Sequence, residues 1–287
     1  MKAIFQREFT SFFKNTTGYI LCSVFILISG IFVCSINFSR AYAGFEYSLY
    51  NACFLYLLFI PILTMRSFAE EKKQKTDQLL LSLPISGPRI VMAKYFSMAA
   101  VLAIPTLILA LIPLIMSFYG TVNFVSAYSS LFAFYLLGCA LTAVGMLISS
   151  LTENQIISAI LTFFVTLIAY FMSSVSAMLP ASSEGSVIAF IALALILAGI
   201  MYYFTKSIGL SVGVWLLAVL LLVSVYFISP KLLEGSFQQA MSTLSVFDCF
   251  YGFVNGVFDL KGVIYYLSLS ALFCYYTVVI FEKRRWS

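Results

Sequence analysis

The stretch YFSMAAVLAIPTLILALIPLIMSFY, residues 95–119, decides the class of this protein. It runs for 25 residues without Asp, Glu, Lys or Arg. A helix needs about 20 predominantly apolar residues to cross the hydrocarbon core of a bilayer. The length and composition of this stretch therefore predict a transmembrane helix.

Seven more runs of the same character lie along the chain, and none of them contains a charged residue. They are residues 18–37, 48–65, 127–150, 155–179, 187–204, 209–228 and 263–281. Only four residues separate the pair at 187–204 and 209–228, so without that pair six spans would remain. We expect an all-α polytopic membrane protein, a single transmembrane domain over residues 1–287, with about eight transmembrane helices.

The composition excludes several classes of protein. Hydrophobic residues make up 62% of the chain and charged residues 9%, which is far from the roughly 25% charge of a soluble domain. The chain has no histidine, so it cannot form a Ser-His-Asp or Cys-His catalytic site or offer His to a metal. Its six cysteines are scattered, which favours free thiols over a metal site. A net charge of +5 from so few charges is typical of membrane loops, so we expect no nucleic-acid partner.

The positive charges predict the orientation. Connections on one side of the predicted spans hold 13 of the Lys and Arg residues, and those on the other side hold 3. Cytoplasmic loops carry the excess of Lys and Arg. We therefore expect both termini and residues 66–94 in the cytoplasm, with residues 229–262 outside.

Residues 66–94 form the largest predicted cytoplasmic segment. The second span is expected to continue as a helix to Lys75, with ion pairs from Glu70 to Lys73 and from Glu71 to Lys75. A short leucine-rich helix would follow, with Thr76 as its N-cap, Asp77 in its first turn, and Pro84 ending it. Its apolar surface would come from Leu79, Leu80, Leu81 and Leu83. This helix either folds onto its own bundle or inserts its leucines into a partner.

Three other connections have recognisable patterns. Residues 1–17 contain Phe5, Phe9 and Phe12 at helical spacing, as in an amphipathic helix that lies in the membrane interface. Thr152 and Gln155 have the spacing of a capping box, which predicts a tight helix restart or a contact with a partner. Residues 236–260 indicate one or two short helices on the outer surface.

The spans contain no ionisable residue with which to bind a coupling ion. The chain also lacks the G-x-x-x-x-G-K-S/T phosphate loop. If the protein moves a substrate against a gradient, the energy must therefore enter from outside the bilayer.

Several segments together resemble the ABC-2-type permeases, in particular the branch with gliding-motility and copper-processing permease subunits. The resemblance runs in order over about two thirds of the chain. The segments that carry it are Thr64–Glu71, Thr76–Pro84, Val91–Tyr95, Ile148–Ile157, Phe247–Leu269 and Arg284–Trp286. It departs from the family at Lys75 and Ala93, where Gly is usual. The family plan has six spans, so residues 187–228 look like an inserted hairpin.

This resemblance implies a membrane subunit of an ATP-driven exporter, expected in a bacterial cytoplasmic membrane. ATP and Mg would bind to a separate ABC-type ATPase, and this chain would bind no cofactor. A second permease copy or a paralogous permease would complete the complex. The implied ATPase-coupling residues are Arg66, Glu70, Glu71, Thr76, Asp77, Leu79, Leu80, Leu83, Pro84, Thr152, Glu153, Asn154 and Gln155.

Two other functions remain open from the residues alone. An intramembrane lipid-modifying enzyme would need a polar cluster within the spans, which offer scattered residues such as Asn37, Asn51, Thr64, Ser173 and Ser174. A membrane scaffold would share the whole composition. Lipids, peptides and hydrophobic small molecules suit the uncharged bundle equally well as substrates, as does mechanical work on an extracytoplasmic accessory protein.

Overall fold

The structure is a computed structural model of the chain. It describes residues 1–76, 85–178, 182–205, 233–256 and 258–286, together with isolated positions between 209 and 226. The described residues divide into two compact units, one of Met1–Ala169 with Cys249–Ser287 and one of Tyr170–Asp248. All regular elements among these residues are helices, as expected for an all-α membrane protein.

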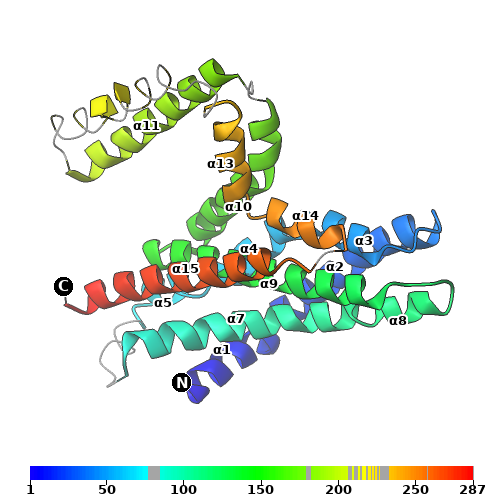
Figure 1. Cartoon of the computed structure of the whole chain (residues 1–287). Helices are drawn as coiled ribbons and strands as arrows, with labels where there is room; N and C mark the ends of the chain where they lie inside the picture. The colour runs from blue at the N-terminus through cyan, green and yellow to red at the C-terminus, as the bar shows by residue number, and fades with distance from the viewer. Residues whose placement is uncertain are drawn as a thin grey trace. The chain divides into compact units, whose positions relative to one another are not determined.

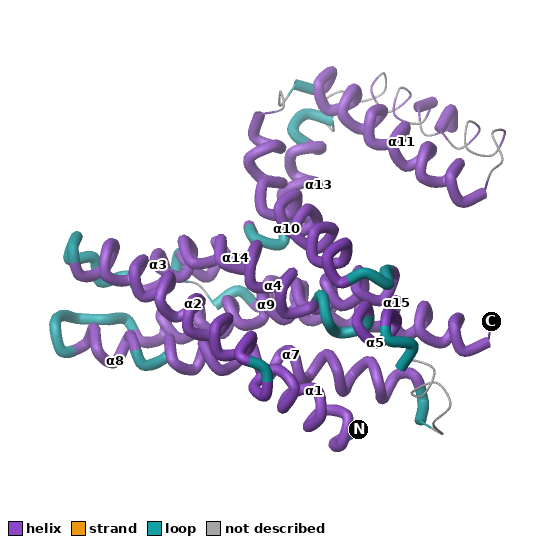
Figure 2. Tube along the Cα trace, turned by 180° about the vertical axis from the view of Figure 1, so that it is seen from behind, coloured by secondary structure: helices purple, strands orange, loops and turns teal. Residues whose placement is uncertain are grey.

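The first unit is a bundle of long helices joined by short ones. It contains α1 (Lys2–Lys14), α2 (Thr16–Val33), α3 (Phe45–Ala52), α4 (Tyr56–Thr64), α5 (Ala69–Lys73), α7 (Gly87–Leu109), α8 (Ile112–Ser117), α9 (Phe124–Leu151), the first part of α10 (Gln155–Met178), α14 (Asp248–Val254) and α15 (Leu260–Trp286). A π-helical turn, Cys34–Phe38, extends α2, and a 3-10 turn, Cys53–Leu55, joins α3 to α4. Helices α7, α9 and α15 run side by side, and α1 packs against α7 (Figures 1 and 2).

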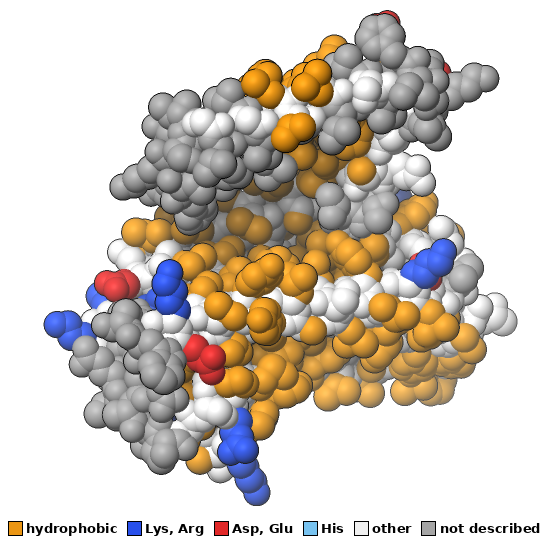
Figure 3. Space-filling view, turned by 60° about the vertical axis from the view of Figure 1, so that its left-hand side comes forward, with side chains coloured by type: hydrophobic (Ala, Val, Ile, Leu, Met, Phe, Trp, Pro, Cys, Tyr) orange, Lys and Arg blue, Asp and Glu red, His pale blue; other side chains and the backbone are white. Residues whose placement is uncertain are grey.

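Six helical segments among the described residues are long and apolar enough to cross a membrane. They are Thr16–Phe38, Phe45–Lys73, Gly87–Ser117, Phe124–Leu151, Gln155–Met172 and Leu260–Lys283. Hydrophobic side chains cover much of the bundle's visible face, and Lys, Arg, Asp and Glu side chains lie toward its ends (Figure 3). The chain is therefore an integral membrane protein.

The closely spaced pair of predicted spans falls in the second unit. Residues 187–204 lie within α11 (Ser183–Thr205), and half of 209–228 lies outside the described residues. The rings of Phe190 on α11 and Phe237 on α13 (Ser236–Leu244) meet at 5.0 Å. Helices α13 and α14 are the two short helices that the sequence indicates between residues 236 and 260.

Small residues let α9 pack tightly at the centre of the bundle. A Cβ atom built on Gly145 would lie less than 3.0 Å from three side-chain atoms of Thr64 on α4. One on Gly138 would lie 2.9 Å from the hydroxyl of Tyr56. The absence of a side chain at these two positions therefore sets how closely α4 approaches α9.

Proline and turn residues shape the other membrane helices. Pro61 lies inside α4 and Pro105 inside α7, and Pro113 lies at the start of α8, just after α7 ends. Proline removes a backbone donor, which favours a bend or a break at such positions.

One end of the bundle brings together segments that are far apart in the sequence. The end of α15, α5 and the start of α7 lie at this end in both ribbon views (Figures 1 and 2). A Cβ atom on Gly87 would lie 2.9 Å from Cγ and Oε1 of Glu282, which confirms the close approach of α7 and α15. Several of the connections that the charge count assigns to the cytoplasm therefore lie at the same end of the bundle.

Candidate coupling site

The turn between α4 and α5 is held by a side chain from a distant helix. Ser149 on α9 accepts hydrogen bonds from the backbone amides of Phe68 and Ala69, both at 3.1 Å, and donates to the carbonyl of Met65 at 3.4 Å. The first amides of a helix have no partner within it, so Ser149 supplies the cap that α5 lacks locally. The chain consequently breaks its helix between Thr64 and Ala69.

This break corrects the prediction that the second span continues as a helix to Lys75. Lys75 has a φ of 57°, the left-handed conformation that glycine adopts most easily. The side chain of Thr76 donates to the carbonyl of Glu71 at 3.3 Å, and this hydrogen bond holds the turn that follows α5.

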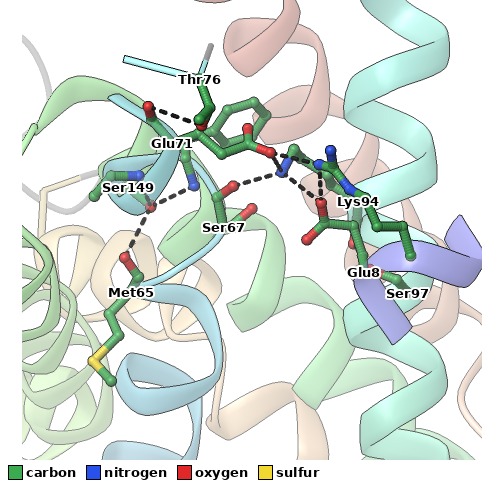
Figure 4. Close-up of polar contacts among 11 residues, drawn as sticks. Glu8, Met65, Ser67, Glu71, Thr76, Lys94, Ser97 and Ser149 are labelled. Carbon is green, nitrogen blue, oxygen red and sulfur yellow. Dashed lines mark hydrogen bonds and ion pairs between the residues drawn. The ribbon is translucent and has the colours of Figure 1, made fainter. Parts of the chain in front are cut away.

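A buried lysine lies at the centre of the site. The side chain of Lys94, on α7, is 1% exposed, and its Nζ lies 3.1 Å from Oε1 of Glu8 and 3.0 Å from Oε1 of Glu71. It also donates to the carbonyl of Ser67 at 2.7 Å. Figure 4 shows Lys94 facing both carboxylates, which come from α1 and α5.

Arg7 completes what we call the charged cluster: Arg7, Glu8, Glu71 and Lys94. Nη2 of Arg7 lies 2.7 Å from Oε1 of both Glu8 and Glu71. Two cations thus share two carboxylates, and the four side chains join α1, α5 and α7. The cluster corrects the expectation of local pairs along the helix, because Glu71 pairs with Arg7 and Lys94 instead of Lys75, and Glu70 accepts from Gln74 instead of pairing with Lys73.

The electrostatics of the cluster favour the charged forms of Glu8 and Arg7. Burial of Glu8 opposes ionisation, but attraction to Lys94 and hydrogen bonds from Arg7 and Lys94 outweigh it, so the pKa of Glu8 lies below its ordinary value. Burial likewise opposes the charge on Arg7, and its contacts with Glu8 and Glu71 outweigh that effect and raise its pKa. Both groups therefore stay ionised at neutral pH.

Apolar and helix-end contacts surround the cluster. The Nζ of Lys94 lies 5.1 Å from the centroid of the Phe68 ring, which packs against Phe281 of α15 at 5.8 Å between centroids. Lys72 donates to the backbone carbonyl of Ser150, at the carboxyl end of α9, where the helix dipole favours a cation. The site thus connects α5 to α1, α7, α9 and α15.

The second predicted coupling segment begins directly after this contact. Helix α9 ends at Leu151 and α10 starts at Gln155, so the tight restart is confirmed. The capping box was wrong, since Asn154 caps α10 by accepting from the amide of Ile156 at 2.9 Å. Thr152, the C-cap residue of α9, donates back to Ile148 at 3.4 Å. Glu153 lies exposed in the same turn.

The structure describes only part of the predicted site. Arg66, Glu70, Glu71 and Thr76 all line one cavity beside the charged cluster. Asp77, Leu79, Leu80, Leu83 and Pro84 lie outside the described residues, so the leucine-rich docking helix stays a prediction. Sequence reasoning did not assign Arg7, Glu8, Lys94 or Ser149 to the site. The signal for Lys94 was its place at the start of a long apolar run.

The comparison with protein families gives one result. The family model described as ABC-2 family transporter protein matches residues 3–184. The chain belongs to this family. The match spans α1 to α10 and so includes the charged cluster and both predicted coupling segments. A search of curated proteins gives no match.

Membership of the ABC-2 family makes the chain a permease subunit of an ABC transporter, the component that carries out membrane transport without being a catalytic subunit. The resemblance at Phe247–Leu269 lies beyond the matched residues. Residues 187–228 also lie beyond them, so the inserted hairpin stays a prediction. The narrower resemblance to gliding-motility and copper-processing permeases also stays a prediction.

Proposed function

We propose that this permease subunit is driven by a separate ABC-type ATPase that docks on residues 66–94 and 151–155, and that it moves its substrate outward across a bacterial cytoplasmic membrane. ATP and Mg would bind to that ATPase, and a second permease copy or a paralogue would complete the pathway. The orientation with both termini in the cytoplasm follows from the distribution of Lys and Arg.

The observation that supports this proposal most strongly is the contact of the first predicted coupling segment with the end of α9, directly before the second segment. Ser149 binds the turn before α5, and Lys72 of α5 binds the end of α9. The charged cluster then joins α5 to α1 and α7. A displacement of α5 by an ATPase would therefore act on several membrane helices at once, as a coupling element requires.

Three of the polar residues named for the alternative enzyme have structural partners. Asn37 donates to the carbonyls of Tyr42 and Gly44 at 2.8 and 3.0 Å. Asn51 donates to Tyr47 at 2.8 Å, and Thr64 to Ile60 at 2.9 Å. These hydrogen bonds to nearby backbone account for the three side chains without a catalytic role.

The experiment replaces Leu80 and Leu83 with Asp in the complete transporter. Burying one leucine contributes about 1.5–3 kcal/mol, so two charges in an apolar docking surface should abolish copurification of the ATPase or uncouple hydrolysis from transport. The control is Lys73→Gln, because Lys73 is exposed and should leave both properties unchanged. The purified chain alone should hydrolyse no ATP.

Two results would contradict the proposal. Normal ATPase binding and coupling in the double Asp variant would indicate that the leucine-rich segment packs against its own bundle instead of docking the ATPase. Robust ATP hydrolysis by the chain alone, with contaminants excluded, would contradict the separate ATPase.

A further inference from the structure

A cavity lies between α1, the α4–α5 turn and α7, and the charged cluster forms part of its lining. Its volume is about 360 Å³, within the size range of small-molecule sites. Its polar wall includes Arg66, Ser67 and Glu70 together with the cluster, and its apolar wall includes Phe12, Ile62 and Met98. The cavity is thus amphipathic, like the molecules that occupy the surface of a bilayer.

Three buried polar atoms in the cavity lining have no hydrogen-bond partner among the residues that the structure describes. They are Nε of Arg66, Oγ of Ser67 and Oε2 of Glu71. Ser67 is 5% exposed as a residue. Most buried polar groups in folded proteins are paired, so two donors and one acceptor gathered in one cavity indicate a ligand with complementary groups.

The charges of the lining restrict the kind of ligand. Arg7, Arg66 and Lys94 face Glu8, Glu70 and Glu71, three cations against three carboxylates. An isolated anion or cation would gain one set of contacts and be repelled by the other set. A ligand that carries both signs can satisfy Arg66 and Ser67 with its anion and the glutamates with its cation.

We propose that this cavity binds the headgroup of a zwitterionic phospholipid with a primary amine, of the phosphatidylethanolamine class. The phosphate accepts from Arg66 and Ser67, and the ammonium group donates to Glu70 and Glu71. The glycerol backbone and the first acyl carbons lie against Phe12, Ile62 and Met98. A primary ammonium group is required because a quaternary one has no N–H to donate to a carboxylate.

The place of the cavity under α1 supports a lipid over a soluble molecule. Phe5, Phe9 and Phe13 form a continuous row of rings along α1, with centroids 6.0 and 5.2 Å apart. Such an aromatic row on an amphipathic helix is typical of a helix that lies in the membrane interface. The headgroup region of the bilayer would then reach the cavity directly.

The test measures lipid retention by the purified chain in detergent, without any ATPase, using native mass spectrometry. Phosphatidylethanolamine, phosphatidylcholine and phosphatidylglycerol with identical acyl chains are added at equal concentration. Phosphatidylethanolamine should be retained about tenfold more than either competitor, the difference expected for one charge-assisted hydrogen bond. Equal retention of the three lipids, or a preference for phosphatidylglycerol, would overturn the proposal.

Variants connect the binding to this cavity. Ser67→Ala removes only a hydroxyl, and Arg66→Gln removes the cation, so both should lower phosphatidylethanolamine retention about tenfold. Glu70→Gln should remove the preference for phosphatidylethanolamine over phosphatidylcholine. Lys73→Gln, outside the cavity lining, is the control that should bind like the original chain. Unchanged retention in Ser67→Ala and Arg66→Gln, both monodisperse by gel filtration, would show that the lipid binds elsewhere.

A final arm separates the lipid from its free headgroup. Soluble phosphoethanolamine lacks the groups that meet the apolar wall, so it should displace the lipid only at more than tenfold higher concentration. Displacement at equal concentration would identify a soluble metabolite as the ligand and overturn the lipid assignment. Because this test uses the chain alone, its failure would leave the proposed ATPase docking intact.

Discussion

Replacing Lys94 with Met tests whether the charged cluster is a structural centre of the bundle. Met has nearly the length of Lys and no charge, so the substitution keeps most of the packing on α7. It removes the ammonium group that lies 3.1 Å from Glu8 and 3.0 Å from Glu71, along with the hydrogen bond to Ser67. The two carboxylates would then share Arg7 alone.

The structure sets the size of the expected effect. Removing one partner of a buried ion pair costs about 3–5 kcal/mol because the remaining charge is left without compensation. The side chains of Glu8 and Glu71 are 16% and 13% exposed and keep Arg7, so we expect the lower end, about 3 kcal/mol. For a chain of this size that corresponds to a fall of about 6 °C in the unfolding temperature.

The assay is thermal unfolding of the purified chain in one detergent. A compensated variant carries Lys94→Met together with Glu8→Gln and Glu71→Gln, which removes the uncompensated charges and should recover at least half of the loss. Lys73→Gln serves as the exposed control and should unfold like the original chain. If Lys94→Met unfolded at the original temperature, or if the compensated variant were less stable than Lys94→Met alone, the argument would be refuted.

Three further predictions concern packing, pH and topology. Gly145→Ala should destabilise the bundle by about 1–3 kcal/mol because its Cβ would overlap Thr64, and adding Thr64→Ala should restore part of the loss in the same unfolding assay. Because the folded-state pKa of Glu8 is lowered, its stabilising contribution is complete above its ordinary value of 4.5 and is lost as the pH falls through the lower folded-state value. Glu8→Gln should therefore lose less stability than the original chain between about pH 5 and about pH 3, and parallel pH curves would contradict this. A cysteine at Lys73, on a Cys-free background, should react with a membrane-impermeant reagent only after the membrane is opened, while one at Glu234 should react in intact cells; the reverse pattern would invert the orientation.

Long uncharged runs made most of the membrane helices predictable. Residues 95–119 gave α8 and most of α7, and 127–150 gave nearly all of α9, because the bilayer requires each span to satisfy its own backbone and to be apolar over a fixed length. Local capping was less predictable. Both Thr152 and Asn154 have side chains that can cap α10, and the choice of Asn154 depends on where α9 stops.

The centre of the coupling site could not be predicted because its contacts are distant in sequence. Ser149 caps α5 from 80 residues away, and Glu8 meets Lys94 across 86 residues. Helical spacing rules compare residues three and four apart, so they assigned Glu71 to Lys75. The burial of Lys94 depends on α1 packing against α7, which no local pattern reveals.

The charged cluster also draws its members from α1, α5 and α7, which are synthesised one after another. Arg7 and Glu8 are synthesised first, Glu71 follows the second span, and Lys94 comes with the third span. Until α7 has been inserted, two carboxylates share a single guanidinium group. Neutralisation of the two acidic side chains is therefore complete only once α7 has packed against α1 and α5.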